Sequence, residues 1–246
     1  MTRRCVAFLG QGVLAARCLP MLLARPELRL GLLVGDAALS ALAAGSGALL
    51  LPAAERRDGD ILEALRSLGI DTLVSVQYPF ILPATVLEAV GSQAFNLHNA
   101  RLPDYRGHNA LSHEILNGER HHSATLHWMQ PRVDTGDIAF EDSVAIAPDE
   151  TAWSLYQKAV PLCGAVFGRF VAALAGDAAI PRVRGADAAA GRFYSRSIAD
   201  LKRITDATDL DGIDRKARAF HFPPHEPAFL ERDGRRLYVV PVWEAR

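Results

Sequence analysis

Asn96 and His98 alternate at the end of a short apolar run. Residues two apart in a β-strand point to the same side of the sheet, so an amide and an imidazole would lie next to each other. An amide N–H can stabilise an oxyanion, and an imidazole can move a proton near neutral pH. Asp134, in a later loop, can return a carboxylate to the same place. These residue types favour acyl transfer, although an isolated Asn-x-His can equally be a self-satisfied polar pair.

The turn Gly10-Gln11-Gly12-Val13-Leu14-Ala15 is a second candidate site, because it follows an apolar run and opens a helical pattern. Asp36 ends the next apolar run. Glycines that allow a close backbone approach to a pyrophosphate, followed by an acid for a ribose hydroxyl, form the dinucleotide fingerprint. The same residues also make a tight strand-to-helix turn in any α/β sheet. On these residues alone, an NAD-dependent oxidoreductase stays open as an alternative.

Six histidines within thirty residues invite a metal interpretation. They are His98, His108, His113, His121, His122 and His127. His113-Glu114 begins an HExxH pattern, but Asn117 stands where the second histidine belongs. No two of the six have the His-x3-His spacing that would place them on one helix face, and the cysteines are far away in the sequence. We therefore expect no metal site, and we expect most of these histidines to be surface or polar-network residues.

The candidate residues need strands and helices to position them, and the first hundred residues alternate between the two patterns. Predicted strands cover residues 5–9, 28–34, 48–51, 72–76 and 94–97, and predicted helices cover 12–23 and 60–68. Short buried strands alternating with helices predict an α/β fold, here a Rossmann-like, doubly wound and mostly parallel sheet. Ligands of such sheets bind at the carboxyl ends of the strands, where both candidate sites fall.

The middle of the chain predicts two longer strands, over residues 124–129 and 138–146. A long helix follows, because apolar residues recur at three and four positions from Trp153 to Leu174. Pro161 lies inside this pattern and predicts a kink. We interpret the apolar stripe as core packing.

The last sixty residues form a shorter, separate segment. Gly185–Gly191 predicts a linker, a helix is expected near 210–219, and Asp233-Gly234 predicts the turn of a terminal hairpin. We therefore expect a catalytic domain over residues 1–184. A C-terminal extension, a helix plus a β-hairpin, would cover residues 185–246.

Composition narrows the class of partner. The chain has 246 residues and a net charge of −1, which argues against a broad nucleic-acid-binding surface. Cys5, Cys18 and Cys163 are too few and too widely spaced for a disulfide framework, and they fit a reducing compartment. No apolar run approaches the roughly 18 residues of a membrane span, and the N-terminal apolar run fits a first strand better than a signal peptide. We expect a cytoplasmic protein with no membrane or nucleic-acid partner.

The surroundings of Asn96 and His98 resemble the signature of the folate-dependent formyltransferases, a family that includes glycinamide ribonucleotide, methionyl-tRNA and sugar-nucleotide enzymes. The residues that carry the resemblance are Asn96, His98, Leu102-Pro103, Tyr105-Arg106-Gly107, the segment Val133-Asp134-Thr135-Gly136-Asp137 and the segment Val76–Pro83. The similarity runs from Val6 to about Gly176, and more weakly to the end.

The resemblance implies the formyltransferase fold, a catalytic trio of Asn96, His98 and Asp134, and N10-formyltetrahydrofolate as formyl donor to an amine. It implies no metal and gives the Gly10–Ala15 turn a structural or acceptor-side role. Whether His98 acts as base or as electrophile stays open. The implied folate-binding residues are Phe80, Ile81, Leu82, Val133 and Asp137. The implied acceptor-binding residues are Tyr105, Arg106, Asn109 and Phe222.

The resemblance is strongest to the sugar-nucleotide members, both after the catalytic strand and in the tail 218–228. About seventy residues follow the long helix, too few for the nucleic-acid-binding barrel of the transfer-RNA enzymes. The implied acceptor is a nucleotide-linked amino sugar for O-antigen or other lipopolysaccharide biosynthesis, used by a homodimer that associates through the C-terminal region. The alternatives are an ornithine acceptor, glycinamide ribonucleotide, or a folate-binding regulatory module.

Overall fold

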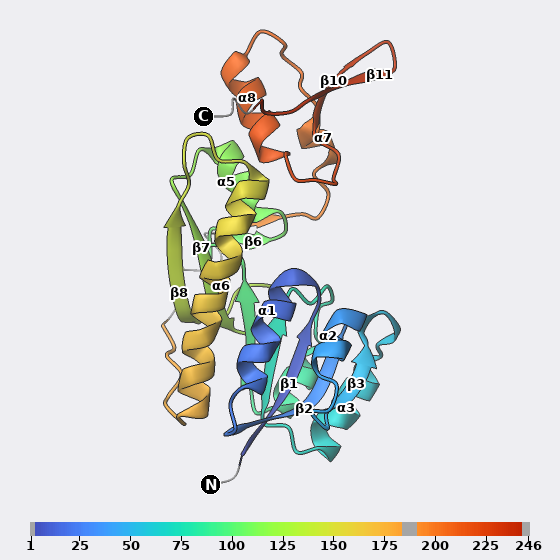
Figure 1. Ribbon diagram of the computed structural model, residues 1–246, viewed down its shortest axis with the longest axis vertical. Coiled ribbons are helices and arrows are strands. Elements are labelled where there is room, and N and C mark those ends of the chain that lie inside the picture. The colour runs from blue at the N-terminus through green and yellow to red at the C-terminus, as the bar shows by residue number, and fades with distance from the viewer. Residues whose placement is uncertain (1–2, 184–190, 243–246) are drawn as a thin grey trace.

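The computed structural model describes residues 3–183 and 191–242, and a seven-stranded sheet forms its centre (Figure 1). The strands lie in the order β3-β2-β1-β4-β5-β7-β8. Their bounds are Arg4–Gly10 for β1, Leu28–Gly35 for β2, Leu49–Pro52 for β3, Thr72–Val76 for β4, Ala94–His98 for β5, His121–Trp128 for β7 and Ile138–Ala145 for β8. The chain runs from the central β1 to one edge and then returns to build the other half, as in a doubly wound sheet.

Two kinds of pairing occur in this sheet. The strands β1 to β5 pair in parallel, whereas β5 with β7 and β7 with β8 are antiparallel. Parallel neighbours need a crossover connection, but β7 and β8 follow each other through the short loop 129–137 and pair as a hairpin. The predicted mostly parallel α/β fold is confirmed, with an antiparallel pair at one edge.

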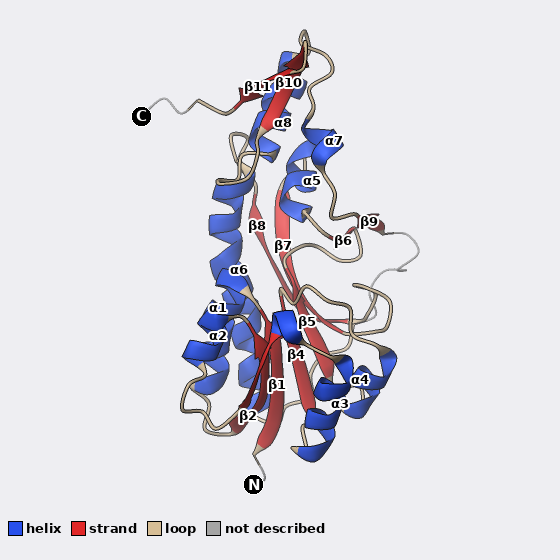
Figure 2. Ribbon diagram, turned by 90° about the vertical axis from the view of Figure 1, so that its right-hand side faces the viewer, coloured by secondary structure: helices blue, strands red, loops and turns tan. Residues whose placement is uncertain are grey.

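Helices cover both faces of the sheet (Figure 2). Alternation within β1 shows why its run is continuously apolar: Val6 and Phe8 pack under α1 and α6, whereas Ala7 and Leu9 pack under α3 and α4. The short helix α2 follows β2. The bounds are Gly12–Leu23 for α1, Ala37–Leu42 for α2, Asp58–Ser67 for α3, Ala84–Ala89 for α4 and Ala152–Ala175 for α6; a 3-10 turn, η1, covers Ala53–Glu55.

The long helix α6 runs beside β7 and β8 and packs on α1. Phe167 and Phe170 are fully buried in the core, as the periodicity predicted, and Pro161 lies inside the helix. Trp153 and Tyr156 at its start are only half-buried, so the core face does not extend to them. The sequence predicted no segment long and apolar enough to span a membrane. Among the described helices, however, α6 meets that criterion of length and composition. Its packing on the sheet is that of a core helix.

The C-terminal segment packs over the end of α6 and over α5 (Figure 1). Leu155 of α6, Ile115 of α5 and Phe220 share one apolar cluster there. The elements of this region are β6 at Tyr105–Gly107, α5 at Ala110–Asn117, β9 at Arg192–Tyr194, α7 at Ala199–Lys202, α8 at Leu210–Ala219, β10 at Ala228–Arg232 and β11 at Arg235–Val239. The expected hairpin is therefore present. All but the last residue of the predicted linker Gly185–Gly191 lies outside the described residues, and the domain division at residue 184 stays a proposal.

The glycine-rich turn joins β1 to α1. A side chain at Gly10 would stand 2.6 Å from the Val76 carbonyl oxygen, and Gly12 has a φ of +73°, so both positions require glycine. The Gly12 N–H donates to Asp36 Oδ2 at 2.8 Å, and the Leu39 N–H donates to Asp36 Oδ1 at 2.9 Å. A dinucleotide interpretation assigns Asp36 to a ribose hydroxyl. In this structure, both oxygens of Asp36 instead accept hydrogen bonds that hold the turn and cap α2.

We expect Asp36→Ala to lower the free energy of unfolding by about 1–2 kcal/mol, because it removes the cap of α2 and the partner of the Gly12 N–H. Asp36→Asn should keep most of that stability, since an amide oxygen also caps helices. Urea denaturation measures both, and Asp149→Ala, in an exposed turn, is the matched control, with a change below about 0.5 kcal/mol. Equal stability of Asp36→Ala and the wild type would contradict this role.

Candidate active site

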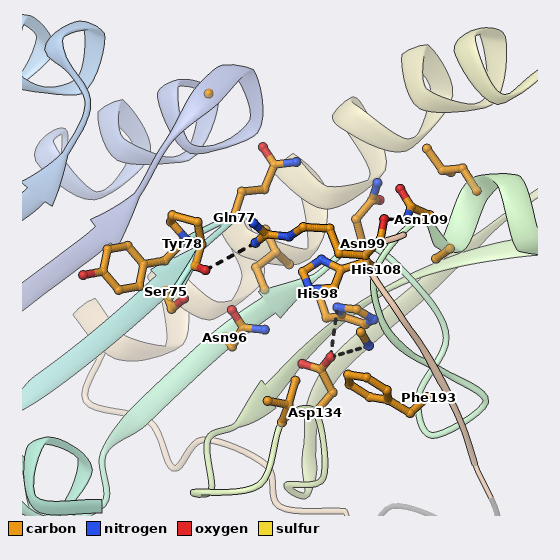
Figure 3. Close-up of a pocket in the computed structure, with 18 of the residues that line it drawn as sticks. Ser75, Gln77, Tyr78, Asn96, His98, Asn99, His108, Asn109, Asp134 and Phe193 are labelled. Atoms are coloured by element: carbon orange, nitrogen blue, oxygen red, sulfur yellow. Dashed lines mark hydrogen bonds and ion pairs between the residues drawn. The ribbon is translucent and has the colours of Figure 1, made fainter. Parts of the chain in front are cut away.

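A cavity of about 790 Å³ opens at the carboxyl ends of β1, β4 and β5. Gln11, Gln77 and His98 line it from these three strand ends, as the doubly wound topology predicts. Figure 3 shows Gln77 and His98 among the lining residues. Residues of the C-terminal segment, among them Arg196 and Phe222, form another part of its lining. Its volume lies within the usual range for ligand pockets.

Asn96 and His98 both face this cavity from β5, whereas Leu97 between them is buried in the core. His98 Nε2 lies 2.7 Å from the carbonyl oxygen of Tyr105. A carbonyl oxygen only accepts hydrogen bonds, so Nε2 carries the hydrogen and Nδ1 is the nitrogen that can take up a proton. Nδ1 lies 3.7 Å from Asp134 Oδ2, which can stabilise the resulting charge.

Asp134 is held in the β7–β8 loop with a φ of +52° and is 9% exposed. Its Oδ2 accepts a hydrogen bond of 2.9 Å from the Gly107 N–H, and its Oδ1 lies 3.4 Å from His127 Nε2. Burial alone would raise the pKa of the Asp134 carboxyl. The charges of His98 and His127 and the hydrogen bonds from His127 and Gly107 outweigh burial, and they hold this pKa well below its usual value. The carboxylate is therefore ionised near neutral pH.

His127 is a site residue that the sequence placed only in the histidine cluster and did not connect with Asn96. It stands directly across from Asn96 in the antiparallel pair β5–β7, and the two side chains meet at 3.1 Å. Its Nδ1 donates to the Trp128 carbonyl oxygen, so Nε2 of the neutral ring accepts from the Asn96 amide, whereas Nε2–H of the protonated ring donates to Asp134 Oδ1 instead. The Asn96 nitrogen has two hydrogens, so the second can point to a ligand oxygen. The trio thus becomes a group of four.

Most of the residues expected to bind folate line the cavity. Phe80 and Ile81 are 40% and 67% exposed, and Leu82 and Val133 also line the cavity. The guanidinium of Arg56 lies 4.2 Å from the centre of the Phe80 ring. Asp137 does not line the cavity, because its carboxylate pairs with Arg182 at 3.2 Å.

The residues expected to bind the acceptor divide into two groups. Asn109 and Phe222 line the cavity. Tyr105 and Arg106 do not, because β6 pairs with β9 and both side chains are buried at 3% and 5% exposure. The Tyr105 hydroxyl donates to Glu119, and Arg106 Nη2 donates to the carbonyl oxygen of Gly191. The placement of these two side chains fits a structural role.

The remaining histidines take several roles. His122 is fully buried against Glu114, His113 packs on Tyr194, and His121 is exposed. His108 lines the cavity, where burial and the nearby charge of Arg196 lower its pKa. Over residues 3–183 and 191–242, no three histidine, cysteine or acidic side chains are grouped as metal ligands.

Residues 36–167 match the family model described as formyl transferase, which covers more than half of the chain. The chain belongs to the formyl transferase family. The chain is 29% identical over 173 residues to GDP-perosamine N-formyltransferase of Brucella melitensis biotype 1, covering 70% of its own length and 65% of the relative's. It is 37% identical over 155 residues to methionyl-tRNA formyltransferase of Parvibaculum lavamentivorans, covering 61% and 48%. The chain therefore aligns with less than two thirds of the length of these relatives.

Solved structures share the whole fold of this formyl transferase. A 4-N formyltransferase from Francisella tularensis superposes with a TM-score of 0.80 at 16% identity, covering 100% of both chains. An N-formyltransferase from Helicobacter canadensis, solved with folinic acid and dTDP-3-aminofucose, gives 0.72 at 17% identity, covering 95% and 85%. At such identities the likeness shows the fold.

Because the pKa of Asp134 is lowered in the folded chain, its ionised form stabilises the fold above the ordinary Asp pKa of about 3.9. That stabilisation is lost as the pH falls toward the lower folded value. We expect Asp134→Asn to lower the free energy of unfolding by about 1–3 kcal/mol at pH ~6, and the difference from the wild type to shrink at pH ~3. Urea denaturation at both pH values measures it.

Asp137→Asn is the matched control, because its carboxylate pairs with Arg182 outside the cavity and should contribute less than about 1 kcal/mol. A difference between wild type and Asp134→Asn that stays the same at both pH values would show that charge is not what Asp134 supplies.

Proposed function

We propose that this protein is an N-formyltransferase that moves a formyl group from N10-formyltetrahydrofolate to the amine of a nucleotide-linked amino sugar. One observation carries the proposal: Asn96, His98 and Asp134 converge on one cavity at the carboxyl end of β5. Family membership supports the formyl chemistry. The Brucella relative, with GDP-perosamine in its name, supports the acceptor class.

His98 and Asn96 divide the work of the transfer. As the neutral amine attacks the formyl carbon, a C–N bond forms and negative charge develops on the formyl oxygen, to which the free Asn96 N–H donates. His98 takes the amine proton at Nδ1 and passes it on to the N10 leaving group as the old C–N bond breaks. Asp134 stabilises the imidazolium in between, 3.7 Å away. Both groups are in place before substrate arrives.

The folate would lie along the rim formed by Phe80, Ile81, Leu82 and Val133. The fit rests on chemistry: two exposed apolar side chains at a cavity edge suit a flat aromatic ring, and exposed large apolar side chains at a rim often mark a ligand site. Arg56 stiffens this rim by stacking on Phe80. Asp137 is left out of the proposed folate contacts, because it is engaged elsewhere.

The acceptor would enter from the C-terminal segment. Arg196 and Lys202 line that part of the cavity, and two cationic side chains suit a diphosphate. Tyr156 and Phe222, whose rings pack 5.3 Å apart, offer aromatic surface to a base. Asn109 lines the same cavity and offers an amide to the acceptor. An enzyme of this kind would serve lipopolysaccharide or O-antigen biosynthesis in the cytoplasm.

The decisive experiment is incubation with N10-formyltetrahydrofolate and a panel of amines, followed by mass spectrometry. The panel contains GDP-perosamine, dTDP-3-aminofucose, ornithine and glycinamide ribonucleotide. We expect one formyl group to be added to a nucleotide sugar, and His98→Ala to lower the turnover about 10²–10⁴-fold. Formylation of ornithine or glycinamide ribonucleotide alone would move the acceptor to a non-sugar amine.

Ligand-induced stabilisation separates this proposal from the NAD-dependent alternative. Binding to the folded state raises the melting temperature, so folinic acid should raise it and NADH should not. A shift with NADH and none with folinic acid would overturn the folate proposal, whatever the outcome of the panel.

We also propose a homodimer that forms through the hairpin β10–β11. Leu237 and Tyr238 on β11 are 66% and 52% exposed, and Val240 just beyond is 49% exposed. Within the described residues β11 pairs with β10 alone, and a two-stranded hairpin is marginal by itself. A second copy would cover both the apolar side chains and the open edge.

Sedimentation velocity tests the dimer at micromolar concentration. We expect Leu237→Glu to convert the wild-type dimer to a monomer, because it places a charge in the covered surface. Leu210→Glu changes a leucine at the start of α8 that is 75% exposed, and it should leave the dimer intact. A wild-type chain that sediments as a monomer would refute the proposal.

A further inference from the structure

Asn99 follows the catalytic strand and lines the cavity next to His98 (Figure 3). Its side-chain oxygen contacts two buried side chains and is not directed to the cavity. His122 Nε2 lies 3.0 Å and Cys163 Sγ lies 3.1 Å from Asn99 Oδ1. Its amide nitrogen makes no hydrogen bond within the described residues. An amide whose oxygen faces inward presents its N–H groups to the cavity.

His122 is itself held by a buried acid. Glu114 and His122 are 1% and 0% exposed, and Glu114 Oε2 lies 2.7 Å from His122 Nδ1. The other oxygen, Glu114 Oε1, is buried without a partner in the described structure. A carboxylate with one oxygen orphaned in the core is unfavourable, whereas a neutral carboxylic acid tolerates the position better. Neither residue has a part in the proton transfer assigned to His98.

The protonation states of this network fix the direction of its hydrogen bonds. Burial raises the pKa of the Glu114 carboxyl, in agreement with the orphaned oxygen. The orphaned Oε1 favours the neutral acid, which donates its O–H to His122 Nδ1, so that His122 donates its Nε2–H to Asn99 Oδ1. Burial also raises the pKa of the Cys163 thiol to about 12, so its S–H remains available as the second donor. Two donors on Oδ1 hold the amide in one orientation.

The position of Asn99 in the cavity indicates that it would contact the acceptor and not the folate. Its partners belong to α6 and β7, and Tyr156 of α6 and Asn109 beside α5 also line the cavity. In Figure 3, Asn99, His108 and Asn109 lie on one side of His98, and Ser75 and Tyr78 lie on the other.

We propose that Asn99 determines acceptor specificity by donating an N–H to a hydroxyl or ring oxygen of the amino sugar next to the reacting amine. In this proposal Glu114 and His122 are positioning residues that hold the Asn99 amide with its donor facing the substrate. It rests on the proposed function and deepens it. A site that is built to donate to a substrate oxygen rejects acceptors that lack one.

Asn99→Asp tests the donor with little change of shape, because a carboxylate oxygen still accepts from His122 and Cys163. The probe is whichever of GDP-perosamine and dTDP-3-aminofucose the wild type formylates. We expect the KM for that nucleotide sugar to rise roughly 10- to 100-fold. The kcat should change less than about threefold, and the KM for N10-formyltetrahydrofolate should be unchanged. Asn96→Ala should show the opposite pattern, a lower kcat with little change in the acceptor KM. Asn96 donates to the formyl oxygen, on which negative charge develops only in the transition state.

Asn117→Asp is the matched control. Asn117 is exposed outside the cavity and donates to the hydroxyls of Tyr105 and Tyr194, so its variant should keep the acceptor KM of the wild type. If Asn99→Asp does not fold, Asn99→Ser removes the long donor in a smaller side chain, and the same rise in acceptor KM is expected.

Glu114 separates positioning from general stability. Glu114→Gln can donate its amide N–H to His122 Nδ1, as the protonated acid does, and should keep the acceptor KM of the wild type. Glu114→Leu cannot donate, leaves the tautomer of His122 free, and should raise this KM roughly 3- to 10-fold without the same loss of kcat. A rise in both variants alike, or in neither, would overturn the positioning roles.

Different results would refute the proposed function and the role of Asn99. A wild-type chain that formylates neither nucleotide sugar, and binds neither in calorimetry, refutes the proposed function and the role of Asn99 with it. A wild-type chain that is active, together with Asn99→Asp or Asn99→Ser at unchanged acceptor KM, refutes the role of Asn99 alone.

Discussion

The buried carboxylate of Asp134 needs compensation, since a negative charge away from water is strongly unfavourable unless hydrogen bonds and positive groups surround it. The chain supplies that compensation from three segments: the Gly107 N–H from β6, His98 from β5 and His127 from β7. Each of these contacts fixes a piece of the cavity. The Gly107 contact holds β6, whose Tyr105 carbonyl in turn sets the tautomer of His98. His127 orients the Asn96 amide. One charge thus fixes β5 relative to β6 and β7.

Hydrophobic periodicity was sufficient for the elements that build the sheet. The predicted bounds of α1, β4 and α8 agree with the structure residue for residue, because glycine, proline or a change of pattern stops each run. Short elements were not predicted: β6, β9 and α7 have three or four residues, too few for the pattern of their own type to repeat twice, and α2, α4 and α5, with six to eight residues, were missed as well. The start of α6 was misjudged for a related reason. Trp153 and Tyr156 fit the apolar stripe, but the sheet ends before them, and Tyr156 faces the cavity instead.

In the candidate site, too, the sequence predicts contacts within one strand but not contacts between distant segments. Asn96 and His98 could be paired from sequence because strand alternation is local. His127 could not, because its place opposite Asn96 depends on the register of two antiparallel strands 31 residues apart. Tyr105 and Arg106 resembled ligand-binding residues in a loop. Their burial depends on Gly191 and β9, which return 85 residues later to pair with β6.

The return of β9 also sets an order of events during synthesis. The central sheet, α6 and all four of Asn96, His98, His127 and Asp134 are synthesised before β9, and chains fold from the N-terminus as they emerge from the ribosome. Until then β6 has no partner strand, and the cavity lacks the wall that Phe193, Arg196 and Phe222 provide. Reactive groups are thus assembled first and enclosed last. Contacts of such large sequence separation form slowly, which makes closure of the cavity the late step of folding.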